Sequence, residues 1–204
     1  MPRRPQFVNK REFIQIEGTK IPHWNQVDRV QFVTFRLADS LPQLKLMEYR
    51  QEKELWLGQH PKPWDEAMQE EYDAMFTAKL DKWIDAGYGG CILKDSRVRD
   101  IVADSIMHLN GDRYDIYAYV IMPNHVHVML TPRADCTVQH IVGGWKRYSS
   151  QQANKLLGHN ALVWERNCFD RLMRSAADYD AHISYIVDNP QHLPSEWYSL
   201  FVAE

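Results

Sequence analysis

Apolar and polar residues alternate along several stretches of the chain, and this pattern predicts strands. Residues 29–37 alternate and lead into a turn rich in Asp, Ser and Pro, which predicts a strand followed by the start of a helix. Residues 113–121 and 125–131 are rich in β-prone side chains and are joined by a Pro-Asn pair, which predicts an antiparallel hairpin. A further strand-like stretch covers residues 163–174.

Helical spacing of apolar residues predicts five helices between and after these strands. They are expected at residues 42–57, 64–86, 95–109, 137–157 and 178–188. When the helix at 64–86 is set aside as an insertion, the order is β-α-β-β-α-β followed by a C-terminal helix. This order predicts an α+β fold with a ferredoxin-like core, an antiparallel sheet and a helical insertion after the first strand.

The same pattern predicts how the chain is organised. We expect an irregular basic arm at 1–27, one folded domain at 28–190 with a helical insertion at about 58–90, and a C-terminal tail at 191–204. At 204 residues the chain is long enough for one domain with a substantial core. The sequence contains no apolar run long enough for a membrane span and no apolar stretch behind its basic N-terminal residues, so we expect a cytoplasmic protein.

Charge and cysteine content narrow the possible functions. The formal net charge is −3, whereas nucleic-acid-binding proteins usually carry a basic excess. Between residues 133 and 174, however, seven basic residues accompany three acidic ones. The three cysteines, Cys91, Cys136 and Cys168, form no C-x-x-C pair, which argues against a disulfide framework or a cysteine-built zinc site.

Two histidines in the second hairpin strand form the first candidate site. His125 and His127 are two residues apart in a strand, so both imidazoles point to the same face and can bind one ion. Imidazoles that fill a protein core or lie at its surface are the alternative. Tyr148 and Gln152 are four residues apart on the following helix and share one of its faces. If that helix packs over the histidines, Tyr148 is a candidate nucleophile and Gln152 a candidate third ligand for Mg²⁺ or Mn²⁺.

The order and spacing of these motifs resemble a known family. The Pro-Asn-His-Val-His segment at 123–127 resembles the histidine-hydrophobic-histidine signature of HUH single-tyrosine transposases, and the chain is most similar to the REP-associated tyrosine transposases. The blocks at 113–122, 145–148, 163–171 and 185–190 support this resemblance. Departures from the family pattern are the helical segment at 64–86, the acidic net charge and a cysteine at position 168.

The resemblance implies a ferredoxin-like nuclease that cleaves and rejoins single-stranded DNA beside a hairpin. It implies that His125, His127 and Gln152 bind Mg²⁺ or Mn²⁺ and that Tyr148 forms a covalent 5′-phosphotyrosine link; Asn154 is the second choice for the third ligand. We expect DNA contacts from Arg133, Lys146, Arg147, Lys155, Arg171 and Arg174. The basic residues of the arm, Arg3, Arg4, Lys10 and Arg11, either contact DNA or form a disordered tail.

Two other functions fit the same residues. The chain could bind hairpin DNA without cleaving it, or it could be a metal-dependent phosphodiesterase that uses water as the nucleophile. The expected partner is single-stranded or hairpin DNA, bound at the nucleoid within the cytoplasm, and not a membrane. A strand and a helix after Tyr148 favour a monomer that acts in cis over a dimer that exchanges the tyrosine helix.

Overall fold

The computed structural model describes residues 2–9, 11–17, 23–61, 64–133 and 136–204, and it divides into two compact units. Residues 1–38 and 92–204 form the first, which we call the sheet unit, and residues 39–91 form the second, the helical unit. Lys10, expected in the basic arm, lies outside the described residues. None of the described helices is long and apolar enough to cross a membrane.

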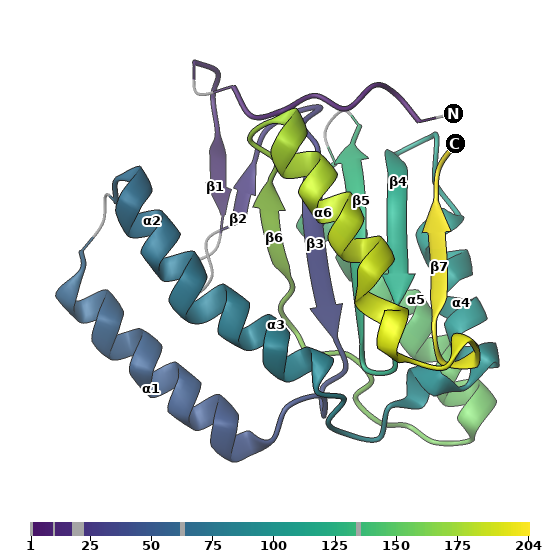
Figure 1. Ribbon diagram of the computed structural model, residues 1–204. Coiled ribbons are helices and arrows are strands. Elements are labelled where there is room, and N and C mark those ends of the chain that lie inside the picture. Colours follow the sequence, from purple (N-terminus) through teal and green to yellow (C-terminus); the bar gives the residue numbers. More distant parts are fainter. Residues whose placement is uncertain (1, 10, 18–22, 62–63, 134–135) are drawn as a thin grey trace. The chain divides into compact units, whose positions relative to one another are not determined.

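An antiparallel sheet of five strands is the centre of the sheet unit (Figure 1). Its strands, in spatial order, are β6 (Phe169–Leu172), β3 (Gln31–Arg36), β5 (His125–Pro132), β4 (Tyr114–Ile121) and β7 (Ser199–Val202). The first and third strands of the core, β3 and β5, lie side by side at its centre, and β4 and β6 flank them. With the helices between them, these four strands form the ferredoxin-like arrangement, which confirms the fold predicted from the sequence.

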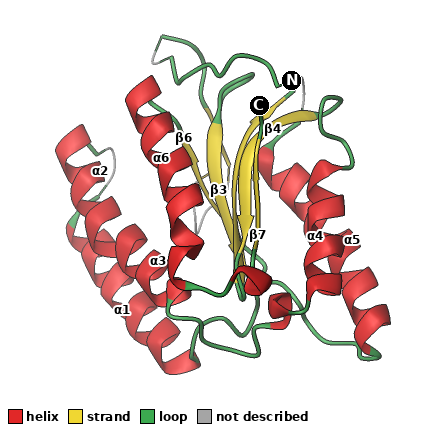
Figure 2. Ribbon diagram, turned by 45° about the vertical axis from the view of Figure 1, so that its right-hand side comes forward, coloured by secondary structure: helices red, strands yellow, loops and turns green. Residues whose placement is uncertain are grey.

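Helices cover both faces of this sheet (Figure 2). On one face lie α4 (Ser96–Met107) and α5 (Val138–Leu157), and on the other lies α6 (Ala176–Asp188). Asp95 caps the start of α4, Thr137 caps α5 and Ser175 caps α6, each through its side-chain oxygen. Gly158 ends α5 in a left-handed conformation with φ of 68°. The caps therefore place the helix ends close to where the sequence predicted them.

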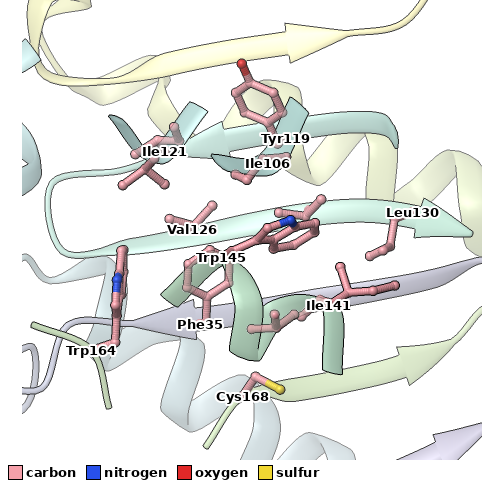
Figure 3. Close-up of a cluster of buried hydrophobic side chains, with 14 of the residues drawn as sticks. Phe35, Ile106, Tyr119, Ile121, Val126, Leu130, Ile141, Trp145, Trp164 and Cys168 are labelled. Carbon is pink, nitrogen blue, oxygen red and sulfur yellow. The ribbon is translucent and has the colours of Figure 1, made fainter. Parts of the chain in front are cut away.

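Alternating side chains of the strands divide the core into two layers. On β5, Val126, Val128 and Leu130 point towards α4 and α5, where they pack with Phe35, Trp145 and Trp164 in the larger layer (Figure 3). The intervening Met129 points towards α6 and packs with Phe32, Tyr117 and Ile186 in the smaller layer. Because β5 lies at the centre of the sheet, its side chains are buried on both faces.

Both ends of the sheet unit contain strands that the sequence did not predict. Residues 191–204, expected as a tail, contain the 3-10 turn η4 (Ser195–Trp197) and strand β7, which pairs with β4. Residues 1–27, expected as an irregular arm, contain β1 (Gln15–Glu17) and β2 (His23–Asn25), which pair with each other. Short strands of this kind show little periodicity, so the pattern of apolar residues did not reveal them.

The helical unit includes more of the chain than the expected insertion at about 58–90. It consists of α1 (Gln43–Gln59), α2 (Glu66–Tyr72), the π-helical turn η1 (Asp73–Thr77) and α3 (Ala78–Asp85). Aromatic rings join these helices: Phe76 packs against Tyr49 and against Trp56, each with a centroid separation of 5.9 Å. The helix expected at 42–57 therefore belongs to this unit, and α4 alone supplies the first crossover helix of the ferredoxin-like core.

Asp39 joins the two ends of the helical unit. Its carboxylate accepts a hydrogen bond of 2.7 Å from the Gly90 backbone N–H. Gly89 has a φ of 92°, and a Cβ at this position would lie 2.5 Å from the Asp39 carbonyl oxygen. Both the backbone conformation and the close approach therefore require glycine at position 89.

An ion-pair cluster fixes the N-terminal arm to the sheet. Asp115 on β4 is almost fully buried and accepts hydrogen bonds of 2.8 Å from Nε of both Arg3 and Arg133. Burial alone would raise the pKa of Asp115, but the hydrogen bonds from Arg133 and Arg3 outweigh it and the pKa is lowered. Farther along the arm, Val8 donates a backbone hydrogen bond of 2.9 Å to Met173. The arm is therefore held to the sheet unit at more than one point.

Replacement of Asp115 by asparagine should destabilise the protein in a pH-dependent way. A lowered pKa means that the carboxylate contributes stability above its unfolded pKa of about 3.9 and loses that contribution as the pH falls. We expect Asp115→Asn to lower the free energy of unfolding by about 1–3 kcal/mol at pH 7 and by progressively less below about pH 4. Urea unfolding at pH 7, 5 and 4 measures this difference, and a difference that grows towards acid pH would contradict it.

Candidate functional site

His125 and His127 lie side by side at the centre of the sheet. Both project from β5 to the face covered by α6, and their ring centroids are 4.6 Å apart. His127 stacks on Phe32 of β3 with a centroid separation of 5.3 Å. The expectation that the two imidazoles share one face agrees with this geometry.

Hydrogen bonds orient both imidazoles through their Nδ1 atoms. Nδ1 of His125 lies 2.8 Å from Oδ1 of Asn124, an oxygen that can only accept, so Nδ1 carries the proton. Nδ1 of His127 lies 2.7 Å from the hydroxyl of Thr34, its cross-strand neighbour. Burial lowers the pKa of His125 to about 3, and burial followed by the neighbouring His125 and His182 lowers that of His127. Both rings are therefore neutral at pH 7, which is the form that binds a metal.

Helix α6 brings a tyrosine to the histidine pair. The ring of Tyr185 lies edge-on to that of His127 with a centroid separation of 5.1 Å, and it lies 6.0 Å from that of Phe32. The Tyr185 hydroxyl oxygen is buried. The position of the helix is fixed by its start, where Ser175 accepts a hydrogen bond from the Asp178 N–H, and by packing of Ile186 into the smaller core layer.

Asn189 lies one turn beyond Tyr185 at the end of the same helix. Residues four apart share a helix face, so we expect the Asn189 side chain to lie on the same side of α6 as Tyr185. Its Oδ1 is buried and has no hydrogen-bond partner among the described residues, and the same holds for Nε2 of His127. Buried polar atoms without a partner are uncommon and call for an explanation, such as an ion that they bind.

Tyr148 and Gln152 are not brought to the histidines. Both lie on α5, which packs on the opposite face of the sheet, and Tyr148 is half exposed. Asn154, the second choice for the third ligand, lies on the same helix, and its amide donates to the Ala161 carbonyl. The error arose because a β-α-β crossover fixes the face on which its helix packs, and that face is lined by Val126 and Val128, not by the histidines.

Several of the expected DNA-binding cations are used within the fold. Arg133 pairs with Asp115, Arg171 lies 3.6 Å from Asp178, and Lys146 donates hydrogen bonds of 2.9 Å to the carbonyls of Glu165 and Asn167. Burial lowers the pKa of Lys146. Arg147, Lys155 and Arg174 are exposed. Of the arm residues, Arg3 is engaged with Asp115, and Arg4 and Arg11 are exposed.

The histidine face has the donor set of a divalent metal site. Two neutral imidazoles from one strand and an amide oxygen from the facing helix are ligands that Mg²⁺ and Mn²⁺ accept. Nε2 of His127 and Oδ1 of Asn189 have no hydrogen-bond partner among the residues that the structure describes. The residues present therefore fit a bound divalent ion. The sequence signal for Tyr185 and Asn189 was the Tyr-Ile-Val-Asp-Asn-Pro block, in which the two residues have the same spacing as Tyr148 and Gln152.

Comparisons with known proteins found a family whose model matches part of this chain. A search of curated proteins found no match. One solved structure, described as a REP-associated tyrosine transposase bound to a REP hairpin, is similar with a TM-score of 0.48 and 16% identity over 85% of this chain and 73% of that chain. At this TM-score the likeness establishes neither a fold nor an activity. The family described as "Transposase IS200 like" matches residues 93–186, a range that contains both histidines and Tyr185. Residues 93–186 are therefore similar to IS200-like transposases, in agreement with the resemblance that the sequence motifs indicated.

Proposed function

We propose that this protein cleaves and rejoins single-stranded DNA beside hairpins through a covalent 5′-phosphotyrosine at Tyr185. The observation that carries the proposal is the position of the Tyr185 ring, 5.1 Å from that of His127 on the histidine face of the sheet. The match of residues 93–186 to the IS200-like transposase family supports this class of chemistry. Tyr185 takes the role that the sequence had suggested for Tyr148.

In the proposed cleavage step, Tyr185 Oη bonds to phosphorus and the bond between phosphorus and the 3′ oxygen breaks. The phenol loses its proton, and the departing 3′ oxygen takes one up, so the products are a 5′-phosphotyrosine and a free 3′-hydroxyl. His182, one turn before Tyr185, offers a group that can accept the phenol proton. Its Nδ1 lies 2.8 Å from the Asp178 carbonyl oxygen and so carries its proton, which leaves Nε2 as the acceptor. Rejoining is the reverse attack by a 3′-hydroxyl.

We further propose that His125, His127 and Asn189 hold the divalent ion. When bound, Mg²⁺ or Mn²⁺ would polarise the phosphoryl oxygen and stabilise charge in the transition state. Asn124 and Thr34 keep the two imidazoles in position through their Nδ1 atoms, as outer partners do in many metal sites. All three proposed ligands and the nucleophile come from one chain, which supports a monomer that acts in cis.

Replacement of Tyr185 by phenylalanine should abolish the covalent adduct. The ring remains but the nucleophilic oxygen is lost, so we expect adduct formation to fall by at least about 10³-fold. The assay incubates the protein with Mn²⁺ and single-stranded DNA that carries the hairpins flanking its own gene. The DNA is labelled at its 3′ end, because this end stays with the enzyme, and the adduct is detected on a denaturing protein gel.

Tyr148→Phe is the matched control, because it removes the same atom from the opposite face of the sheet. It should leave adduct formation within about twofold of the wild type. Loss of the adduct in Tyr148→Phe and not in Tyr185→Phe would refute the assignment. Cleavage without any adduct would favour a phosphodiesterase that uses water, and hairpin binding with neither cleavage nor adduct would favour a binding module.

Metal binding should depend on Asn189 and not on Gln152. Loss of a ligand leaves only two imidazoles, so we expect Asn189→Ala to weaken Mn²⁺ binding by about 10-fold or more, while Gln152→Ala leaves it unchanged. Titration calorimetry measures the affinity directly. In thermal unfolding, Mn²⁺ at 100 times its Kd should stabilise the wild type by about 2.7 kcal/mol and His127→Ala much less. Weakened binding in Gln152→Ala alone would contradict the assignment.

A further inference from the structure

A cavity of about 670 Å³ opens between α4 and α5, on the face of the sheet opposite the histidines. All of its lining residues belong to the sheet unit. Its volume lies in the range of small-molecule sites, about 300–1,000 Å³. Because the sheet separates it from Tyr185, the proposed cleavage chemistry does not explain this cavity.

The inner wall of the cavity is apolar, and there is free space next to it. It is formed by Met107, Leu109, Ile141 and Trp145. The indole N–H of Trp145 donates a hydrogen bond of 2.9 Å to the Tyr114 hydroxyl, so its polar atom is already satisfied and its carbon surface remains for contact. Gly144 leaves room beside this wall, because a Cβ added there would meet no atom within 4 Å.

The rim carries polar groups that the fold does not use. Asp104, His108, Arg113, His140 and Tyr148 line the cavity and are exposed. Within the described part of the chain, none of these side chains makes a hydrogen bond or an ion pair. In contrast, the expected DNA-binding residues Arg133 and Lys146 are held by internal partners. Convergent polar groups around an apolar pocket are typical of a ligand site.

The chemistry of wall and rim fits a nucleotide. The apolar wall and the half-exposed ring of Tyr148 suit a flat base, which gains from stacking on an aromatic side chain. Arg113 suits a phosphate, and Asp104 can accept hydrogen bonds from an exocyclic amine. We propose that the cavity between α4 and α5 binds a nucleotide, with the base against the wall and the phosphate at Arg113. The nucleotide is either an unpaired residue of single-stranded DNA or a free mononucleotide.

Two adjacent glycines provide a matched pair of variants for the test. Gly144→Leu places a side chain in the cavity, whereas Gly143→Leu makes the same change one residue earlier, at an exposed position outside the lining. Neither added Cβ meets an atom within 4 Å, so both variants should fold. Both are made in full-length protein that also carries Tyr185→Phe, and binding is measured in EDTA, so that the proposed metal site does not contribute.

The probes are dAMP and a short single-stranded oligonucleotide with one 2-aminopurine, measured by titration calorimetry and by fluorescence. We expect Gly144→Leu to weaken binding of at least one probe by about 10-fold or more and Gly143→Leu to change it less than about twofold. Tyr148→Ala should weaken the same probe by about fivefold or more through lost stacking. Binding of the oligonucleotide alone identifies the source as DNA, and binding of dAMP alone identifies a free nucleotide.

Two results would overturn the inference: neither probe binds, or Gly144→Leu binds as tightly as Gly143→Leu. Failure of this inference can be distinguished from failure of the proposed function, because the binding test uses protein that lacks the proposed nucleophile and is measured without metal. Likewise, a failure to detect a Tyr185 adduct would leave the comparison of the two glycine variants intact.

Discussion

The alternation of side chains along β5 is the constraint on which the rest of the sheet unit depends. This strand is buried on both faces, so each residue is committed to one of two separate layers. Its valines and Leu130 face α4 and α5, while its histidines and Met129 face α6. A shift of pairing by one residue would exchange these sets and place two imidazoles in the larger apolar core. The hydrophobic packing of α5 and the proposed chemistry at α6 therefore require the same register.

This division explains which features of the fold and of the candidate site could be predicted from the sequence. Strand and helix periodicity, together with the caps, predicted the ferredoxin-like core, because those signals lie within single elements. That both histidines lie on one face followed from their spacing of two residues along a strand. Assignment of the tyrosine required knowledge of which helix covers which face, and that depends on crossovers between distant segments. Tyr148 and Tyr185 have the same local signature, each with an amide residue four positions later, so local sequence could not separate them.

The distribution of charge is a second feature that local sequence describes incompletely. Lys146 and Arg133 stood out in the sequence as part of a basic region. In the structure, Lys146 donates to backbone carbonyls and Arg133 pairs with a carboxylate, and these partners are distant along the chain. Composition reveals how many cations a segment has but not which of them already have partners within the fold. Short pairings such as β4 with β7 were missed for a related reason, because four residues give too little pattern to identify a strand.

The contact between Asp39 and the glycines at 89 and 90 bears on how such a chain could have changed over time. A segment of about fifty residues leaves the core after β3 and returns before α4 at points that a single hydrogen bond connects. Segments whose ends nearly touch can be lengthened, shortened or lost without strain on the elements that flank them. The helical unit therefore has the properties of an insertion. Related chains could lack it, or carry a different insertion at the same place, and still form the same sheet.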